Sequence, residues 1–377
     1  MQFMAPVRRE RTIAVADVMS GGASVAILAL PALDDARVIA SAHTLMVPER
    51  ADPVHAALAV GSQVEEVSDK ALKSLGAARP QIERVHLTMH TPWILSQSIR
   101  TMQRFSDERR IDHALVGAVA RDALSAESPS KQRPYEAAVT RIWLDGYPVR
   151  HVEGKYAHSV AVASLISNAD ERVERTVIAS LEKAFPAASV TRHSGLLSAL
   201  KASGRAAGED YVIVSVGIES THLAVVHDGM ITQQCSVPEG IRTMLSRFAP
   251  ERAPEETLGS MRMLEREACA DAACEALKSS VAAAEPDLAR VFGETIAKIA
   301  SEQRLPNTLV LFVQNDFAEW LSRFFARIDF SQFTVTTLPF DVAIMRSPDF
   351  SSKLSSADKL EPSLAAACIA ALSQEND

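Results

Sequence analysis

The residues best suited to do chemistry lie in a turn between two apolar runs near the middle of the chain. Residues 211–235 read YVIVSVGIESTHLAVVHDGMITQQC, in which the segment GIEST separates the two runs. Apolar runs of this length bounded by turn residues are typical of β-strands, and the Asp228-Gly229 pair predicts a hairpin. A turn rich in Gly, Ser and Thr can surround a phosphate with backbone N–H groups. The candidate ligand-binding residues in this turn are Gly217, Glu219, Ser220 and Thr221. A plain three-stranded meander without a ligand is the alternative.

A second turn of the same plan lies near the start of the chain. Residues 12–30 read TIAVADVMSGGASVAILAL, again an apolar run, a turn of small residues and a second apolar run. The candidate binding residues here are Asp17, Ser20, Gly21 and Gly22. Because a repeated supersecondary unit is a sign of internal duplication, the two meanders predict two related lobes.

Other residues that bind metals or act in catalysis show no comparable pattern. His86 and His90 share one face of a strand predicted over residues 82–95, but two histidines alone rarely form a metal site, so a structural role is favoured. The P-loop, nucleophile-elbow, zinc-protease and dinucleotide-binding motifs are all missing from the sequence. We therefore predict no metal site and no catalytic residue.

Composition narrows the class of protein. A chain of 377 residues is long enough for two or three domains, and its net charge of −8 argues against nucleic acid as the main partner. No apolar run approaches the roughly 18 residues that cross a bilayer, so we expect no direct membrane insertion. The four cysteines (Cys235, Cys269, Cys274 and Cys368) include no CxxC pair, which favours reduced thiols in a cytoplasmic protein.

The elements around the two turns alternate between helix and strand. Helical spacing of apolar residues spans residues 54–75, 111–124 and 171–185, and residues 139–144 and 159–166 read as strands. Residues 204–208 are the best candidate for a linker between lobes. Residues 308–313 (TLVLFV) form an apolar strand that leads through a polar turn into a helix, a unit that presents ligands in α/β proteins.

Together these features resemble the actin-like ATPase fold, and within it the family of the bacterial cell-division protein FtsA and the pilus assembly protein PilM. The segment 212–226 (VIVSVGIESTHLAVV) resembles the family's second phosphate motif, and Pro238-Glu239-Gly240 the Pro-x-Gly that follows it. Asp17 with the Ser-Gly-Gly turn resembles the first phosphate motif, and residues 310–316 the adenosine motif. Only the second phosphate motif is specific.

The resemblance implies an α/β chain with a two-lobed actin-like (ribonuclease H-like) fold and a small inserted subdomain of the SHS2 or 1C type. The implied division assigns residues 1–84 to the first lobe and residues 85–168 to the insert. Residues 169–208 then continue the first lobe, and residues 209–377 form the second lobe.

The sequence also departs from the family's motifs. Ser215 stands where the family has an acidic residue that helps to hold Mg²⁺, and His222 replaces the acid after Ser-Thr. Met19 replaces a glycine of the first motif, and Gln314-Asn315 replaces the glycine pair of the adenosine motif. The resemblance implies ATP and Mg²⁺ as cofactors, but these losses predict a pseudo-ATPase without a required cofactor. Weak nucleotide binding through backbone groups of the Gly217 turn is the alternative.

Three functions follow from the resemblance. The favoured one is a non-catalytic, PilM-like cytoplasmic scaffold that docks the cytoplasmic tail of an inner-membrane protein in type IV pilus assembly, in the cleft between the first lobe and the insert. The second is an FtsA-like division protein that tethers filaments at the membrane, and the third is a weak ATPase. The expected partners are a membrane-protein tail, a filament-forming protein or a second copy of the chain. The acidic end of the sequence, SQEND, argues against the basic amphipathic helix of FtsA.

Overall fold

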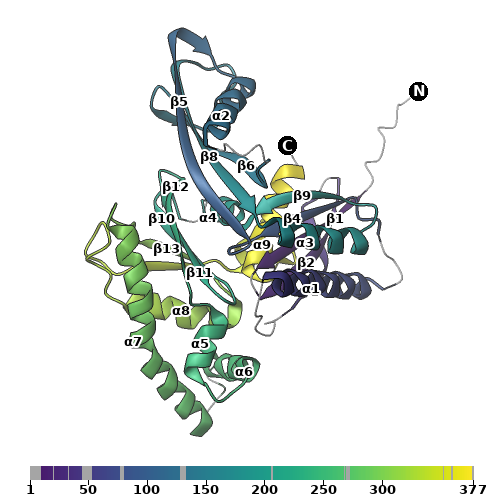
Figure 1. Ribbon diagram of the computed structural model, residues 1–377, viewed down its shortest axis with the longest axis vertical. Coiled ribbons are helices and arrows are strands. Elements are labelled where there is room, and N and C mark those ends of the chain that lie inside the picture. Colours follow the sequence, from purple (N-terminus) through teal and green to yellow (C-terminus); the bar gives the residue numbers. More distant parts are fainter. Residues whose placement is uncertain are drawn as a thin grey trace.

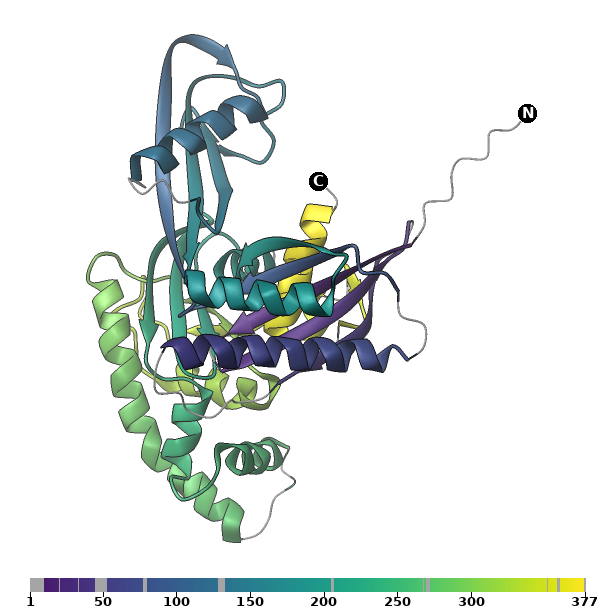
Figure 2. The same cartoon turned by 45° about the vertical axis from the view of Figure 1, so that its right-hand side comes forward.

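The computed structural model describes residues 10–19, 21–32, 34–44, 53–76, 80–127, 133–204, 207–266, 268, 272–350, 352–357 and 360–375. These residues form two lobes, each with its own sheet, and a third sheet that projects from them (Figures 1 and 2). Within the described part of the chain, no helix is both long enough and apolar enough to cross a membrane.

The first lobe is built on the meander predicted near the start of the chain. Its six-stranded sheet has the order β15-β3-β2-β1-β4-β9. The strands are β1 (Arg11–Met19), β2 (Gly22–Leu30), β3 (Ala36–His43), β4 (Arg84–Met89), β9 (Ser189–Ser194) and β15 (Leu354–Ser355). Helices α1 (Pro53–Ser74) and α3 (Glu171–Ala184) pack together over one face (Figure 2). The predicted pairing of the two apolar runs is confirmed, since β1 pairs with β2 antiparallel, and β3 pairs with β2 as a third antiparallel strand.

The second lobe repeats this plan. Its five-stranded sheet has the order β12-β11-β10-β13-β14, so a meander again pairs through its first strand with a parallel strand. The strands are β10 (Tyr211–Val216), β11 (Thr221–His227), β12 (Met230–Val237), β13 (Thr308–Phe312) and β14 (Asp341–Ile344). The helices are α5 (Ile241–Phe248), α6 (Pro254–Glu265), α7 (Ala272–Ala300) and α8 (Asn315–Arg327). The predicted hairpin turn is confirmed, because Asp228 and Gly229 adopt φ angles of 51° and 69°.

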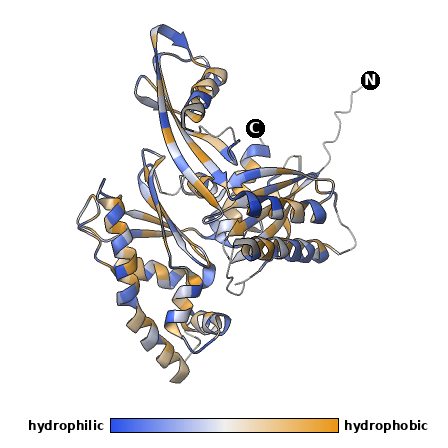
Figure 3. Cartoon of the chain, in the orientation of Figure 1, coloured by the Kyte–Doolittle hydropathy of each residue, from blue (hydrophilic) through white to orange (hydrophobic). Residues whose placement is uncertain are grey.

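The third sheet has the order β5-β8-β6-β7 and carries helix α2 (His113–Glu127). Its strands are β5 (Ile94–Arg110), β6 (Glu136–Leu144), β7 (Tyr147–Val149) and β8 (Tyr156–Ala169). The far end of β5 is exposed and coloured hydrophilic in Figure 3. Strand β4 lies in the first sheet between β1 and β9, so the residues of the projecting sheet begin at Ile94.

Two helices between the lobes bury side chains from both of them. Helix α4 (Gly195–Ser203) and helix α9 (Pro362–Glu375) share one apolar cluster with β1 and β2 of the first lobe and β10 of the second. Helix α9 is buried almost throughout from Leu364 to Leu372, and the short 3₁₀ helix η1 (Ser347–Phe350) packs beside it. The chain thus returns at its end to contact the first lobe.

One cysteine differs from the sequence-based expectation. Cys235 and Cys368 are free thiols, but Cys274 takes part in a disulfide bond. The expectation of four reduced thiols is therefore wrong.

Candidate functional site

A cavity of about 290 Å³ lies between the two lobes. The carboxyl ends of β1 and β4 reach it from the first lobe, and those of β10 and β13 reach it from the second. This is the edge at which α/β sheets bind ligands, because the loops that follow parallel strands meet there. The cavity is therefore the candidate functional site.

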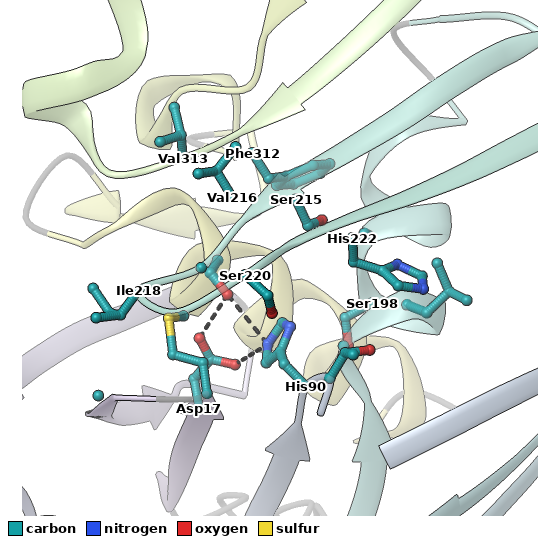
Figure 4. A pocket seen from close by; sticks show the side chains of 18 of the residues that line it. Asp17, His90, Ser198, Ser215, Val216, Ile218, Ser220, His222, Phe312 and Val313 are labelled. Atoms are coloured by element: carbon teal, nitrogen blue, oxygen red, sulfur yellow. Dashed lines mark hydrogen bonds and ion pairs between the residues drawn. The ribbon is translucent and has the colours of Figure 1, made fainter. Parts of the chain in front are cut away.

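Asp17, at the carboxyl end of β1, is the central ionisable residue of the site. Its side chain is buried, and Oδ1 lies 2.6 Å from Nε2 of His90, the residue after β4. The hydroxyl of Ser363, near the start of α9, donates to the other oxygen of Asp17 over 2.6 Å. Figure 4 shows Asp17 and His90 facing one another across this contact. Both carboxylate oxygens thus already have partners from the protein.

The His90 ring carries the balancing charge. Burial lowers the pKa of His90, but the Asp17 carboxylate and its hydrogen bond outweigh that effect and raise the pKa above its usual value. The raised pKa favours the protonated form of the His90 ring beside Asp17. This geometry is not that of a nucleophilic triad, because Ser363 donates its proton to Asp17 and reaches the same His90 nitrogen, at 3.3 Å.

Gly195, the first residue of α4, makes room for His90. A Cβ atom at this position would lie 2.1 Å from Nδ1 of His90, well inside van der Waals contact. The side chain of Ser194 caps α4 by accepting from the Leu197 N–H. The position of the cap and the absence of a side chain at Gly195 together fix where the imidazole lies.

The two predicted phosphate turns are in direct contact. The side chain of Ile218 packs on Gly21, where an added Cβ would lie 2.7 Å from Cγ2 of Ile218. Gly21 has a φ of 83°, which favours glycine independently of this contact. A Cβ at Gly240 would lie 2.4 Å from the Ile218 carbonyl oxygen, so the Pro-x-Gly glycine is required for close packing.

The predicted binding residues separate into two groups. Asp17, Gly22, Gly217 and Ser220 line the cavity. Ser20 lies outside the described residues.

The remaining three serve the packing of the turns. Gly21 supports Ile218, and Glu219 forms an ion pair of 3.1 Å with Arg242. Thr221 is buried and its hydroxyl donates to the carbonyl oxygen of Glu239 over 2.7 Å.

The substituted motif positions Ser215 and His222 lie opposite one another on β10 and β11, and both line the cavity. Burial lowers the pKa of His222 to about 4, with a contribution from the positive charge of His90, although Gln234 hydrogen-bonds to the ring. His222 is therefore neutral at physiological pH.

A short segment at the start of α9 joins the lobes across the site. The Glu361 carboxylate accepts from the backbone N–H of Asn315, the first residue of α8, over 3.3 Å. Ser363, two residues later, binds Asp17 of the first lobe. Burial raises the pKa of Glu361. We call residues 361–363 the interlobe clasp.

These residues do not fit a Mg²⁺-nucleotide. Of the described residues that line the cavity, none is Lys or Arg, and the clasp supplies carboxyl and hydroxyl groups to positions that could otherwise receive ligand atoms. In the described ranges no group of three or more His, Cys, Asp or Glu side chains is arranged to hold a metal ion. A triphosphate would therefore find no Lys or Arg among the described lining side chains, and the His90 ring is already paired with Asp17.

Comparison with known proteins yields no matching family model and no matching curated protein. Among solved structures, the chain is similar to the PilM-PilN type IV pilus biogenesis complex, with a TM-score of 0.54 and 12% identity over 96% of this chain and 98% of that chain. It is also similar to the ethanolamine utilization protein EutJ from Carboxydothermus hydrogenoformans (TM-score 0.46, 11% identity, 96% and 91% covered). A Bacteroides thetaiotaomicron protein with an actin-like ATPase fold follows at a TM-score of 0.39 and 11% identity, with 91% and 94% covered. The chain has the two-lobed α/β architecture of the actin-like ATPase fold, as the sequence predicted.

Proposed function

We propose that this protein is a non-catalytic scaffold of a cell-envelope machine that docks the cytoplasmic tail of an inner-membrane partner, as in type IV pilus assembly. The observation that carries the proposal is the pairing of both Asp17 oxygens with His90 and Ser363. A catalytic acid in this fold must be free to position metal and water, whereas here it holds the lobes together. In this proposal the chain keeps the two-lobed actin-like fold, but its acidic residue Asp17 is engaged by His90 and Ser363 instead of metal and water.

The partner class comes from the structural likeness. The similar solved structure is a complex of two proteins, PilM and PilN, named for type IV pilus biogenesis. A tail segment bound by a folded lobe would anchor this chain at the inner face of the membrane without insertion of its own helices. Helix α9 offers no lipid-facing side in its apolar stretch, since Leu364 to Leu372 are buried.

The docking surface is proposed to lie between the first lobe and the projecting sheet. We assign that sheet, with its element order β5-α2-β6-β7-β8, to the SHS2-type insert and retain residues 1–84, 85–168, 169–208 and 209–377 as the units of the chain, except that β4 (Arg84–Met89) pairs with β1 and β9 of the first sheet. Leu95 and Val139 pair with Asn168 and Ser164 of β8, four residues apart, so they share one face of the sheet. Both are exposed apolar side chains, by 72% and 41%. Such a face suits an extended segment with apolar side chains.

The first experiment measures nucleotide binding and turnover. Titration calorimetry with Mg²⁺-ATP and a phosphate-release assay should detect neither micromolar binding nor hydrolysis by the wild-type chain. Micromolar affinity together with turnover would support the weak-ATPase alternative and remove the scaffold proposal.

The second experiment measures partner capture from detergent-solubilised membranes of the source cells. Wild-type protein should retain a bitopic membrane protein, and Val139→Asp should lose it because a buried charge opposes docking. Val335→Asp is the matched control, since Val335 is 60% exposed in the second lobe. Equal capture by both variants would show that the docking surface does not include Val139. Absence of any membrane partner, together with strong liposome binding by the isolated chain, would favour the FtsA-like function.

A further inference from the structure

Two of the ionisable groups around the interlobe cavity pair with each other, and burial shifts two more toward their neutral forms. The Asp17 carboxylate is balanced by His90, and burial shifts Glu361 toward its neutral form. His222 is neutral at physiological pH for the same reason of burial. The described lining residues include no Lys or Arg, and His43 is the one lining histidine besides His90 and His222.

The wall of the cavity is mainly apolar. From the second lobe, Val216, Ile218 and Ile241 contribute branched side chains, and Phe312 and Val313 line it at the end of β13. Figure 4 shows Phe312, Val313 and Val216 on the second-lobe side of the space. Burial of a charged group against such a wall is costly, whereas burial of apolar ligand surface is favourable by about 25 cal/mol per Å².

Neutral hydrogen-bonding groups are gathered on another side of the cavity. Ser215 and His222 face each other across neighbouring strands, and Ser198 approaches from α4 (Figure 4). The Ser198 hydroxyl donates to the Ser194 carbonyl oxygen, so its lone pairs remain to accept a hydrogen bond from a ligand. The polar side therefore recognises hydroxyl, amide or ring N–H groups rather than ions.

We propose that this cavity binds an uncharged, mainly apolar small molecule in place of a nucleotide. Its apolar part lies against Phe312, Val313 and Ile241, and its hydrogen-bonding group lies near Ser198, Ser215 and His222. The cavity volume of about 290 Å³ is at the small end of ligand sites. This inference goes beyond the scaffold function: Leu95 of the proposed docking face also lines the cavity, but Val139, at which docking is tested, is not among the described lining residues.

The test uses three probes of one shape that differ in charge: 4-fluorobenzyl alcohol, 4-fluorobenzylamine and 4-fluorobenzoate. Fluorine NMR titration of the full chain at neutral pH should give an affinity for the alcohol at least tenfold higher than for the amine or the benzoate. Mg²⁺-ATP should fail to displace the bound alcohol. Equal affinities, preference for a charged probe, absence of binding or displacement by Mg²⁺-ATP would each overturn the inference.

Two further measurements locate the probe. Ser215→Leu fills the cavity and should weaken binding of the alcohol at least tenfold, whereas Ser279→Leu on the exposed surface of α7 should leave it unchanged. In the wild-type chain, methyl signals of Ile241 and Val313 should shift on titration while those of Leu277 in α7 stay fixed. This second readout holds even if Ser215→Leu does not fold, and shifts confined to other regions would place the probe outside the cavity. Loss of partner capture by Val139→Asp would leave all these titrations unaffected.

Discussion

His86 and His193 stack in the buried interior of the first lobe, with Nδ1 of His86 2.9 Å from Nε2 of His193. His86 lies on β4 and its Nε2 is 3.1 Å from the Glu375 carboxylate at the end of α9. His193 lies on β9, and its Nδ1 is 3.5 Å from Glu136 on β6. A chain of four titratable side chains thus connects the last helix, through the first sheet, to the projecting sheet.

Protonation of His86 should destabilise the fold as the pH falls. Burial, with a contribution from His193, lowers the pKa of His86 from 6.5 to about 4, against the opposing effect of Glu375. The unfolded chain therefore binds more protons than the native state between those values, so stability is lost as the pH falls from 6.5 toward 4. Between pH 7 and pH 5 the free energy of unfolding of wild type should fall by about 2 kcal/mol more than that of His86→Gln, as measured by urea unfolding.

His113→Gln is the control for His86→Gln, because the His113 side chain is 74% exposed. The control should follow the wild-type pH dependence. His222, whose pKa is also lowered to about 4, keeps part of the acid sensitivity in both variants. Identical pH dependence of His86→Gln and wild type would contradict the assignment.

The Asp17–His90 pair should show the opposite pH dependence. A raised histidine pKa means that the stabilisation is complete below about 6.5 and is lost as the pH rises through the folded-state value. Asp17→Asn breaks a buried ion pair and should cost about 3 kcal/mol at pH 6 and less at pH 9. Urea unfolding at the two pH values checks this, and an NMR titration of the His90 ring should show a lower pKa in the variant.

Asp69→Asn, which removes an exposed helical pair with Lys73, is the matched control and should change stability by no more than about 0.5 kcal/mol. A cost of Asp17→Asn that is the same at both pH values would mean that His90 is not the charged partner.

Gly195→Ala should be destabilising although it places alanine in a helix. Its Cβ would meet the His90 ring at 2.1 Å, so the imidazole must move away from Asp17, at a cost of about 1–3 kcal/mol. Gly259→Ala in α6 is the control, since no atom lies within 4 Å of its added Cβ. It should gain up to about 1 kcal/mol from helix propensity. Thermal unfolding of the two variants distinguishes the cases, and a gain in both would exclude the packing role of Gly195.

Local signals explain what the sequence could predict. The Asp228-Gly229 turn specifies its own positive φ angles, and the apolar runs of both meanders pair with their neighbours along the chain. The prediction of two lobes followed from the occurrence of two such meanders in one chain. In contrast, β5 was missed beyond its first residues because most of it is exposed and lacks the alternation that marks a half-buried strand.

The site was only partly predictable because its partners are far apart in the chain. Asp17 was identified from its turn, but Ser363 lies 346 residues away, and nothing in the local sequence of α9 marks it. The sequence placed His90 on a predicted strand and favoured a structural role for it. The structure shows what that role is, because the His90 ring pairs with Asp17. Ile218 sits inside the recognised motif, yet its packing on Gly21 depends on how the two lobes approach each other.

The interlobe clasp gives a prediction that separates hydrogen bonding from charge. Burial raises the pKa of Glu361, so the native state binds a proton more readily than the unfolded chain, and stability falls as the pH rises above about 4.5. Glu361→Gln keeps an acceptor for the Asn315 N–H without the charge and should be as stable as wild type, or more so, at pH 7. Glu361→Leu removes the acceptor and should cost about 1 kcal/mol, because the first turn of α8 loses its cap. Urea unfolding at pH 5 and pH 7 tests both variants. Equal destabilisation of the Gln and Leu variants relative to wild type at pH 7 would show that the clasp depends on the negative charge of Glu361 rather than on its hydrogen bond to α8.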